Sequence, residues 1–402
     1  MSADIPHAPA FRPPVSSGLL KAGYFTLEGL NSFATTYYFY YFYFFMSKAF
    51  GYGNRANLTL AALNGAVYAV VAWAAGRLAQ RFGYFRALKL GFALMCAALL
   101  TGSQLRSAAG QITMMCLAVS GMCFTWPTLE ALVSEGESRA GLQRMVGIYN
   151  VVWAATGALA YFVGGALLQT FGLGSLFFVP ATIQAGQLAL TFWLEAQTRR
   201  GIQTGARDGE APVPGSPAES RAGSFLRMSW LANPFAYIAI NTLVAMMPGV
   251  ARRLDLSTMI AGFCCSLWCF ARLAAFVGLW LWPGWHYRFR WLLAAYLTLV
   301  GSFAAILLAP SLAVLFPAQA LFGAAVGLIY YSSLFYSMDL SDAKGEHGGI
   351  HEAVIGLGNC VGPAVGAASL CLLPQYAGSG AIAVTGLLVL GLGGLVALWR
   401  RG

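Results

Sequence analysis

The sequence is dominated by apolar segments that are each long enough to cross a lipid bilayer. The hydrocarbon core of a bilayer is about 30 Å thick, so a spanning helix needs roughly 20 mostly apolar residues. The segments lie at about 19–47, 56–75, 86–104, 110–133, 145–170, 174–195, 229–249, 256–282, 291–309, 311–337, 350–373 and 379–398. Only 9% of the 402 residues are charged, against about 25% in an ordinary soluble domain. The sequence therefore predicts an all-α integral membrane protein with about twelve transmembrane helices.

One long polar stretch divides these segments into two sets of six. Its Gly, Pro, Ser and charged residues are typical of a flexible linker. The N-terminal residues are also polar and contain four prolines, without the apolar core of a secretory signal. The predicted parts are a disordered cytoplasmic tail (1–18), a first six-helix bundle (19–196), a cytoplasmic linker (197–226) and a second six-helix bundle (227–402).

The basic residues predict the orientation of the chain. If the N-terminus is cytoplasmic, 18 of the 24 Lys and Arg residues lie on the cytoplasmic side and one, Arg272, lies within a span. The five on the other side are Lys48, Arg55, Arg106, Arg252 and Arg253. This positive-inside bias predicts that both termini are cytoplasmic, in a cell (inner) membrane. It also accounts for the net charge of +10 without a nucleic-acid partner.

The two halves carry traces of an internal repeat. A shift of 209 residues brings Glu130 onto Asp339, Gly147 onto Gly356 and Asn150 onto Asn359. Chance is an alternative explanation, because glycine is common in this chain. The repeat agrees with a layout of two related bundles.

The loop between the second and third segments carries a family resemblance. Residues 76–89 read GRLAQRFGYFRALK. This resembles the loop signature of the major facilitator superfamily, which has a glycine, an acidic–basic pair and a second glycine followed by basic residues. Gly76, Arg81 and Gly83 fit, whereas Gln80 stands where the family usually has aspartate and the next basic residue is delayed to Arg86.

The resemblance implies two pseudo-symmetric six-helix bundles that expose a central site alternately to each side of the membrane. It implies a secondary active transporter of a small organic solute, for which we expect proton coupling and a monomer. In the family, the first, fourth, seventh and tenth spans line the cavity, and the acidic loop residue is thought to lock a cytoplasmic gate. Because Gln80 cannot form a salt bridge, a weaker lock is expected. The expected gate residues are Gly76, Gln80, Arg81, Gly83, Arg86, Glu130, Arg144 and Asp339, with Glu130 and Asp339 contacting loop arginines such as Arg81 or Arg144.

Small residues in the fifth and eleventh spans are expected to let helices pack closely. The residues are Gly164, Gly165, Gly362, Pro363 and Gly366. The eleventh span resembles the glycine–proline motif that family antiporters carry in their fifth span. The fifth span here lacks most of that motif, so antiport is not inferred.

Ionisable groups within a bilayer are costly and usually functional. Arg272 is expected either to bind an anionic group of the substrate or influence a nearby carboxylate, or to form a fixed ion pair between helices. Glu28, Asn31, Thr35 and Tyr38 share one face of the first span, which is expected to line a cavity. Desolvation favours a protonated Glu28 and a nearby arginine favours an ionised one. We therefore expect Glu28 to carry the proton under the influence of Arg272; the alternative is a structural hydrogen-bond anchor.

Further candidates for substrate contact are Asn241, Tyr330 and Tyr331 in the seventh and tenth spans. Most rings of the aromatic run at 37–45 are expected to pack or to face lipid, and Tyr38 and Tyr41 to be available for stacking on a solute. His347 and His351 are four residues apart, as in some metal sites, but Gly348 and Gly349 favour a polar gate loop instead.

No nucleophile or phosphate-binding motif is found in the sequence. We therefore expect no catalytic residues, no cofactor and no bound metal, and a lipid bilayer, a small molecule and protons as partners. The alternatives are a receptor-like membrane sensor, a lipid-modifying enzyme and, within the transporter class, a lipid flippase.

Overall fold

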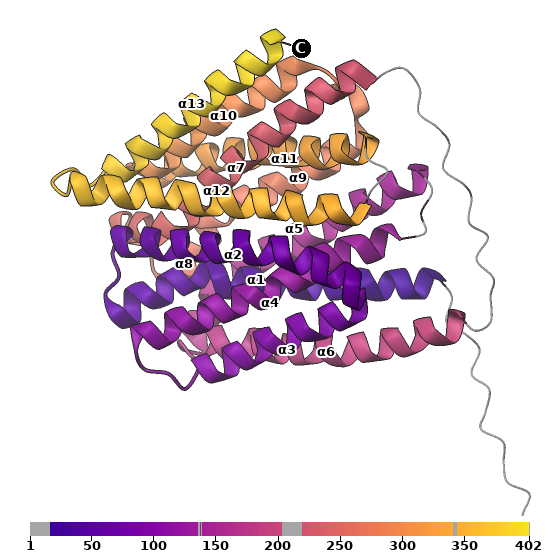
Figure 1. The fold of residues 1–402 in the computed structure, drawn as a ribbon. Coiled ribbons are helices and arrows are strands. Elements are labelled where there is room, and N and C mark those ends of the chain that lie inside the picture. Colours follow the sequence, from indigo (N-terminus) through magenta and orange to yellow (C-terminus); the bar gives the residue numbers. More distant parts are fainter. Residues whose placement is uncertain (1–16, 136, 138, 203–218, 341–343, 402) are drawn as a thin grey trace, which may run out of the picture.

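A computed structural model describes residues 17–135, 137, 139–202, 219–340 and 344–401. These residues form α-helices joined by short turns, with one short 3-10 helix and no strands among them (Figure 1). The helices of the first half are α1 (Ser17–Phe50), α2 (Asn54–Phe82), α3 (Tyr84–Gly102), α4 (Ala108–Ser134), α5 (Arg139–Thr170) and α6 (Ser175–Ile202). Those of the second half are α7 (Glu219–Arg253), α8 (Thr258–Cys265), α9 (Leu267–Leu281), η1 (Pro283–Trp285), α10 (Phe289–Leu308), α11 (Leu312–Leu340), α12 (Lys344–Leu372) and α13 (Ser379–Arg401).

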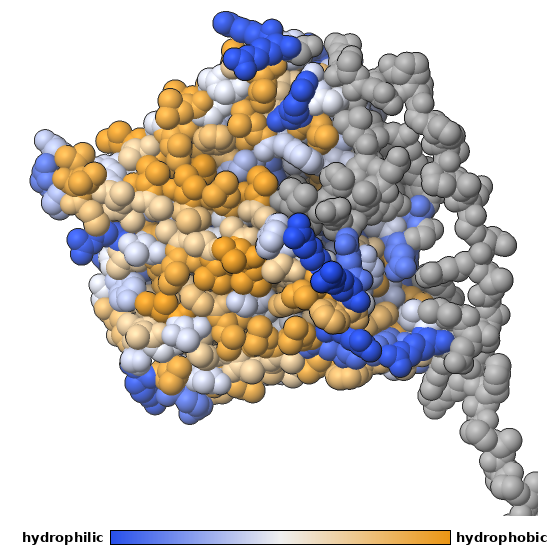
Figure 2. Space-filling view, in the orientation of Figure 1, coloured by the Kyte–Doolittle hydropathy of each residue, from blue (hydrophilic) through white to orange (hydrophobic). Residues whose placement is uncertain are grey.

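Eleven helical segments of the described chain are long and apolar enough to cross a bilayer, with α8 and α9 acting as one span that is interrupted at Ser266. α1 is long enough as well, at 34 residues, but its tyrosines and its polar stripe lower its hydropathy. Figure 2 shows hydrophobic residues over most of one face and strongly hydrophilic residues toward its two ends. This surface matches a helical bundle that is embedded in a bilayer.

The helices lie where the apolar segments predict them, but several, α6, α7 and α12 among them, are longer than predicted. α6 and α7 extend into the predicted linker, because α6 ends at Ile202 and α7 begins at Glu219. The rest of the linker and most of the predicted N-terminal tail lie outside the described residues. The predicted gate loop around Gly348 and Gly349 is wrong in its backbone, because α12 already begins at Lys344. The side chains of His347 and His351 lie outside the described residues.

Successive spans run in opposite directions, so their ends lie at the two ends of the bundle. We call the end of the bundle where α1 begins and α13 ends the terminal face, and the other end the opposite face (Figure 1). The turn between α2 and α3 lies on the terminal face and consists of Gly83 alone. Its φ of 94° favours glycine, since other residues rarely adopt positive φ. Gly76, by contrast, lies inside α2 and contributes nothing to the turn.

Each half packs mainly on itself, and a few helices join the halves. α1 contacts α4, α5 and α6, while α7 contacts α10, α11, α12 and α13. Between the halves, α2 runs along α12, and α5 runs along α8 and α9. At these crossings Gly147 lies against Trp280 of α9, and Gly356 lies against Ala69 of α2. The predicted repeat places Gly147 and Gly356 at equivalent positions, so the two crossings are related as the repeat requires.

Candidate functional site

Three acidic side chains from both halves converge inside the bundle. Glu28 of α1 is completely buried, Glu352 of α12 is 6% exposed, and Glu130 of α4 is half-buried. Each lies close enough to the others to interact electrostatically. Neither oxygen of Glu28 accepts a hydrogen bond from the part of the chain that the structure describes, although Tyr149 of α5 faces it. We call Glu28, Glu130 and Glu352 the carboxylate cluster.

Glu352 is the member of the cluster whose role the sequence analysis missed. It ends the stretch 342–352, for which the two glycines Gly348 and Gly349 predict a polar gate loop, whereas the structure places Glu352 in the first turns of α12. Its Oε2 accepts a hydrogen bond from the hydroxyl of Tyr68 on α2, so the contact joins the two halves. An acidic residue at the start of an apolar segment could have indicated a buried carboxylate. The two glycines before Glu352 favoured a loop instead.

Arg272 lies deeper in the bundle, in an aromatic cage. Its guanidinium carbon lies 4.4 Å from the ring centre of Trp153 on α5 and 4.9 Å from that of Trp268 on α9. Tyr40 of α1 and Tyr237 of α7 also face it. The alternative of a fixed ion pair between helices is not seen among the described residues. Among the described residues, no direct contact joins Glu28 and Arg272, so the expected influence of Arg272 on the protonation of Glu28 has no contact to support it.

Trp153 connects the cage with the rest of the site. Its backbone carbonyl accepts a hydrogen bond from Ser32 of α1 at 2.7 Å, and its indole N–H donates one to Asn150 at 3.0 Å. Its ring also packs edge-on against Tyr330 of α11 and Phe276 of α9. These contacts fix the ring that faces Arg272 and place aromatic side chains of both halves around it.

Apart from Glu28, the predicted polar stripe of α1 makes its contacts within the first half. Asn31 donates a hydrogen bond to Thr125 of α4 at 3.2 Å, and Thr35 donates one to the carbonyl of Asn31 at 2.7 Å. Tyr38 packs against Phe177 of α6. The aromatic residue of α1 that reaches the arginine cage is Tyr40, which the sequence analysis did not single out, because a single helix does not reveal which of its faces meets the other half.

The other predicted substrate residues lie in the second half. Asn241 of α7 donates a hydrogen bond to Asn359 of α12. Tyr330 packs against Tyr237 and Trp153, and Tyr331 packs against Trp285. Both tyrosines of α11 thus lie where the two halves meet. Tyr41 donates a hydrogen bond to the carbonyl of Tyr161 at 2.5 Å and is buried between helices.

The predicted gate residues do not form one group. Gln80, Arg81 and Arg86 are exposed near the α2–α3 turn. Glu130 belongs to the carboxylate cluster, and within the described residues it forms no ion pair with Arg81 or Arg144, so its expected partners are corrected. The side chain of Asp339 lies outside the described residues.

The predicted packing residues lie at close helix crossings. A Cβ on Gly164 would meet the rings of Tyr37 and Tyr41, and one on Gly165 would lie 2.3 Å from the carbonyl of Thr258 on α8. Gly362 likewise lies against the backbone of Ile238 on α7, and Gly366 lies against Leu58 on α2. Pro363 lies inside α12 between these two contacts.

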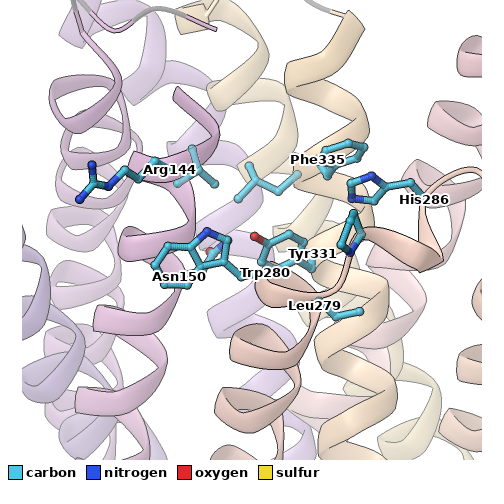
Figure 3. A pocket seen from close by; sticks show the side chains of 10 residues that line it. Arg144, Asn150, Leu279, Trp280, His286, Tyr331 and Phe335 are labelled. Carbon is cyan, nitrogen blue, oxygen red and sulfur yellow. The ribbon is translucent and has the colours of Figure 1, made fainter. Parts of the chain in front are cut away.

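A pocket of about 300 Å³ opens between the halves near the terminal face (Figure 3). It is lined by residues of α5, α9, η1, α11 and the turn after η1, and contains no acidic side chain among them. The lining residues are Arg144, Val146, Asn150, Leu279, Trp280, Pro283, His286, Tyr331, Leu334 and Phe335. The guanidinium of Arg144 points away from the other labelled side chains, so this residue lies at the rim (Figure 3).

The protein thus consists of two bundles that meet at a few crossings, with buried charges between them, and comparison with known families identifies it. Residues 24–366 match the Major Facilitator Superfamily. The chain belongs to this family. It is accordingly a multi-pass membrane transporter with the twelve-helix fold of the family. α1 and the eleven segments described above make up the twelve spans.

Solved structures of transporters share this fold. A bacterial homolog of the human lysosomal transporter Spinster, inward-facing and unoccupied, superposes with a TM-score of 0.67 at 15% identity, covering 96% of each chain. The nucleoside transporter NupG gives a TM-score of 0.67 at 11% identity, covering 95% of this chain and 99% of its own. The human organic anion transporter MFSD10 gives 0.63 at 17% identity, covering 96% and 100%. Among curated proteins, none matches the chain in sequence.

Proposed function

We propose that the protein is a secondary active transporter that moves a small organic solute by alternating access and couples this movement to protons. The observation that carries the proposal is the carboxylate cluster. It places Glu28 and Glu130 of the first half beside Glu352 of the second half, where the two halves must move relative to each other.

Protonation of this cluster offers a physical link between the proton and the conformation. Several ionised carboxylates close together in a medium of low dielectric constant repel each other, and each proton that binds removes part of that repulsion. Separating the halves would also break the hydrogen bond between Tyr68 and Glu352. The number of protons bound to the carboxylate cluster therefore shifts the equilibrium between the conformations of the transporter, as coupled transport requires.

We propose further that the terminal face is cytoplasmic and that the protein works as a monomer in the cell (inner) membrane. The charge bias of the loops supports this orientation. The gate would then lie near the α2–α3 turn and the terminal ends of α4, α5 and α11, with the pocket of Figure 3 between them.

The test is transport by purified protein in liposomes. Labelled organic acids, bases, nucleosides, sugars and a labelled phospholipid are offered with and without an inward pH gradient. Uphill uptake of one class that requires the gradient supports the proposal. Absence of transport of every class under every gradient contradicts it and favours the receptor-like alternative, and movement of the lipid alone identifies a flippase.

A variant of Glu28 separates coupling from transport itself. Glu28→Gln keeps the shape of the side chain but cannot exchange a proton, so we expect exchange of solute across the membrane to persist while pH-driven accumulation is lost. The matched control is Glu195→Gln, because Glu195 forms ion pairs with Lys89 and Arg199 away from the cluster. Unchanged accumulation by Glu28→Gln would remove Glu28 as the proton carrier.

A further inference from the structure

Arg272 is a buried positive charge without a counterion among the residues that the structure describes. Its side chain is 5% exposed, and its Nε has no hydrogen-bond partner. Burying an ion is unfavourable unless a partner compensates for the lost hydration. Two aromatic faces at 4.4 and 4.9 Å offset part of this cost, since a desolvated cation is attracted to the face of an aromatic ring.

The surroundings of Arg272 are aromatic rather than acidic. Trp153, Trp268, Tyr40 and Tyr237 face it from four helices. Tyr237 also interacts electrostatically with Glu352 and Glu130, so it lies between Arg272 and the carboxylate cluster. The rings cover the faces of the guanidinium, and Tyr40 lies within hydrogen-bonding reach of it. Its Nε–H has no partner among the described residues, and a carboxylate is the planar acceptor that matches a guanidinium.

The pocket near the terminal face has a related character. Its polar side chains are mostly donors, and the amide nitrogen of the buried Asn150 has no hydrogen-bond partner within the described residues. Tyr331 lines the pocket and packs against Phe276. Phe276 packs against Trp153, and the guanidinium of Arg272 lies over the ring of Trp153. A chain of aromatic side chains thus leads from the pocket to the arginine cage.

We propose that the carried solute is an organic anion with an aromatic or otherwise planar body, whose acidic group binds Arg272. This proposal rests on the proposed function and names its substrate class. The body stacks among the rings around Trp153, and the acidic group supplies the counterion that the described part of the chain lacks. A cation would be repelled by Arg272, and a neutral solute would leave its charge uncompensated.

The test compares acids with their own amides. Benzoate, phenylacetate and indole-3-acetate are each paired with benzamide, phenylacetamide and indole-3-acetamide, with benzylamine as the cation. Binding to the purified, full-length protein is measured by thermal shift with a thiol-reactive dye, for which the eight free cysteines are reporters. We expect at least one acid to bind ten-fold or more tightly than its amide and benzylamine not to bind. The proposal is overturned if no acid binds better than its amide.

Variants tie the preference to Arg272. Arg272→Gln should abolish the preference for the acid, while Arg272→Lys should keep the preference at lower affinity, because lysine keeps the charge but loses the planar fork and its stacking. The lysine variant serves as the test if the glutamine variant fails to fold. The matched control is Arg106→Gln, since Arg106 is exposed in a turn of the opposite face.

The two proposals fail in different ways. If Arg272→Gln leaves the acid's advantage intact, the substrate class is wrong while pH-driven transport of another solute still stands. If acids bind through Arg272 but no solute crosses the liposome membrane, the anion site stands and the transport proposal fails.

Discussion

Tyr68 of α2 donates a hydrogen bond to the carboxylate of Glu352 on α12, so the first half of the protein holds an acid of the second. Two glycines lie next to this contact. A Cβ on Gly65 would lie 2.3 Å from the backbone carbon of Asn359, and one on Gly356 would lie 2.6 Å from the Cα of Ala69. The two helices therefore touch backbone to backbone beside the hydrogen bond, and larger side chains at Gly65 and Gly356 would not fit.

Replacing Tyr68 by phenylalanine should destabilise the observed state. The change leaves an oxygen of the buried Glu352 without its donor, and such losses cost about 1–3 kcal/mol. We expect a lower apparent Tm, measured with the thiol-reactive dye. The matched control is Tyr296→Phe, because the buried hydroxyl of Tyr296 has no partner within the described residues, so its removal should be neutral or stabilising. Equal Tm values for the two variants would contradict the importance of the Tyr68 contact.

Replacing Gly165 by alanine should weaken the contact between α5 and α8. The new Cβ would lie 2.3 Å from the carbonyl of Thr258, and overpacking of this kind costs about 1–3 kcal/mol. Gly186 in α6 has open space around it, so Gly186→Ala should stabilise its helix by about 0.5–1 kcal/mol. The apparent Tm should therefore fall for the first variant and rise or stay constant for the second. A rise for both would show that α5 and α8 have room to adjust.

The spans were predictable because each is a long apolar run between polar turns, and lipid forces such runs into helices. Glu28 and Arg272 were found for the same reason, since a charge in an apolar run is conspicuous. Their partners were not predictable. Glu352 follows two glycines that favour a loop, and only the packing of α12 along α2 shows that the helix begins earlier.

The arginine cage shows a second limit. A helix pattern groups Glu28 with Tyr38 on one face of α1, but it does not tell which face meets the other half of the protein. Tyr40, on another face, reaches Arg272, whereas Tyr38 packs inside the first half. Contacts between helices far apart in sequence depend on how the two halves pack together, and no pattern within a single helix predicts that packing.

If an anion binds Arg272, its binding should depend on pH. Glu352 and Arg272 both interact electrostatically with Tyr237, so they lie in the same region of the protein. Glu28 and Glu130 lie beside Glu352. A bound anion adds a negative charge near ionised carboxylates, so it should bind more tightly when the cluster is protonated, and by linkage its binding should draw protons in. Calorimetric titration of benzoate in buffers of different ionisation enthalpy measures this proton uptake.

A neutral variant of the cluster provides the control for that linkage. Glu352→Gln should bind benzoate with an affinity that varies less with pH, and should take up fewer protons on binding. Proton uptake that is the same in Glu352→Gln and in the unmodified protein would show that the cluster and Arg272 are independent.

A cross-link at the opposite face should stop transport but leave ligand binding intact. There the side chain of Gln169 on α5 accepts a hydrogen bond from the backbone N–H of Met259 on α8 at 3.0 Å, next to the tight contact of Gly165 with Thr258. A cysteine at each of Gln169 and Met259, once oxidised to a disulfide, would hold α5 and α8 together at this end. Alternating access requires that this end open, so oxidation should abolish transport and reduction should restore it.

The pocket near the terminal face lies at the other end of α5, so a probe anion should still bind the oxidised protein. The single-cysteine variants control for oxidation of the native cysteines, and full transport by the cross-linked protein would show that the halves move without parting here.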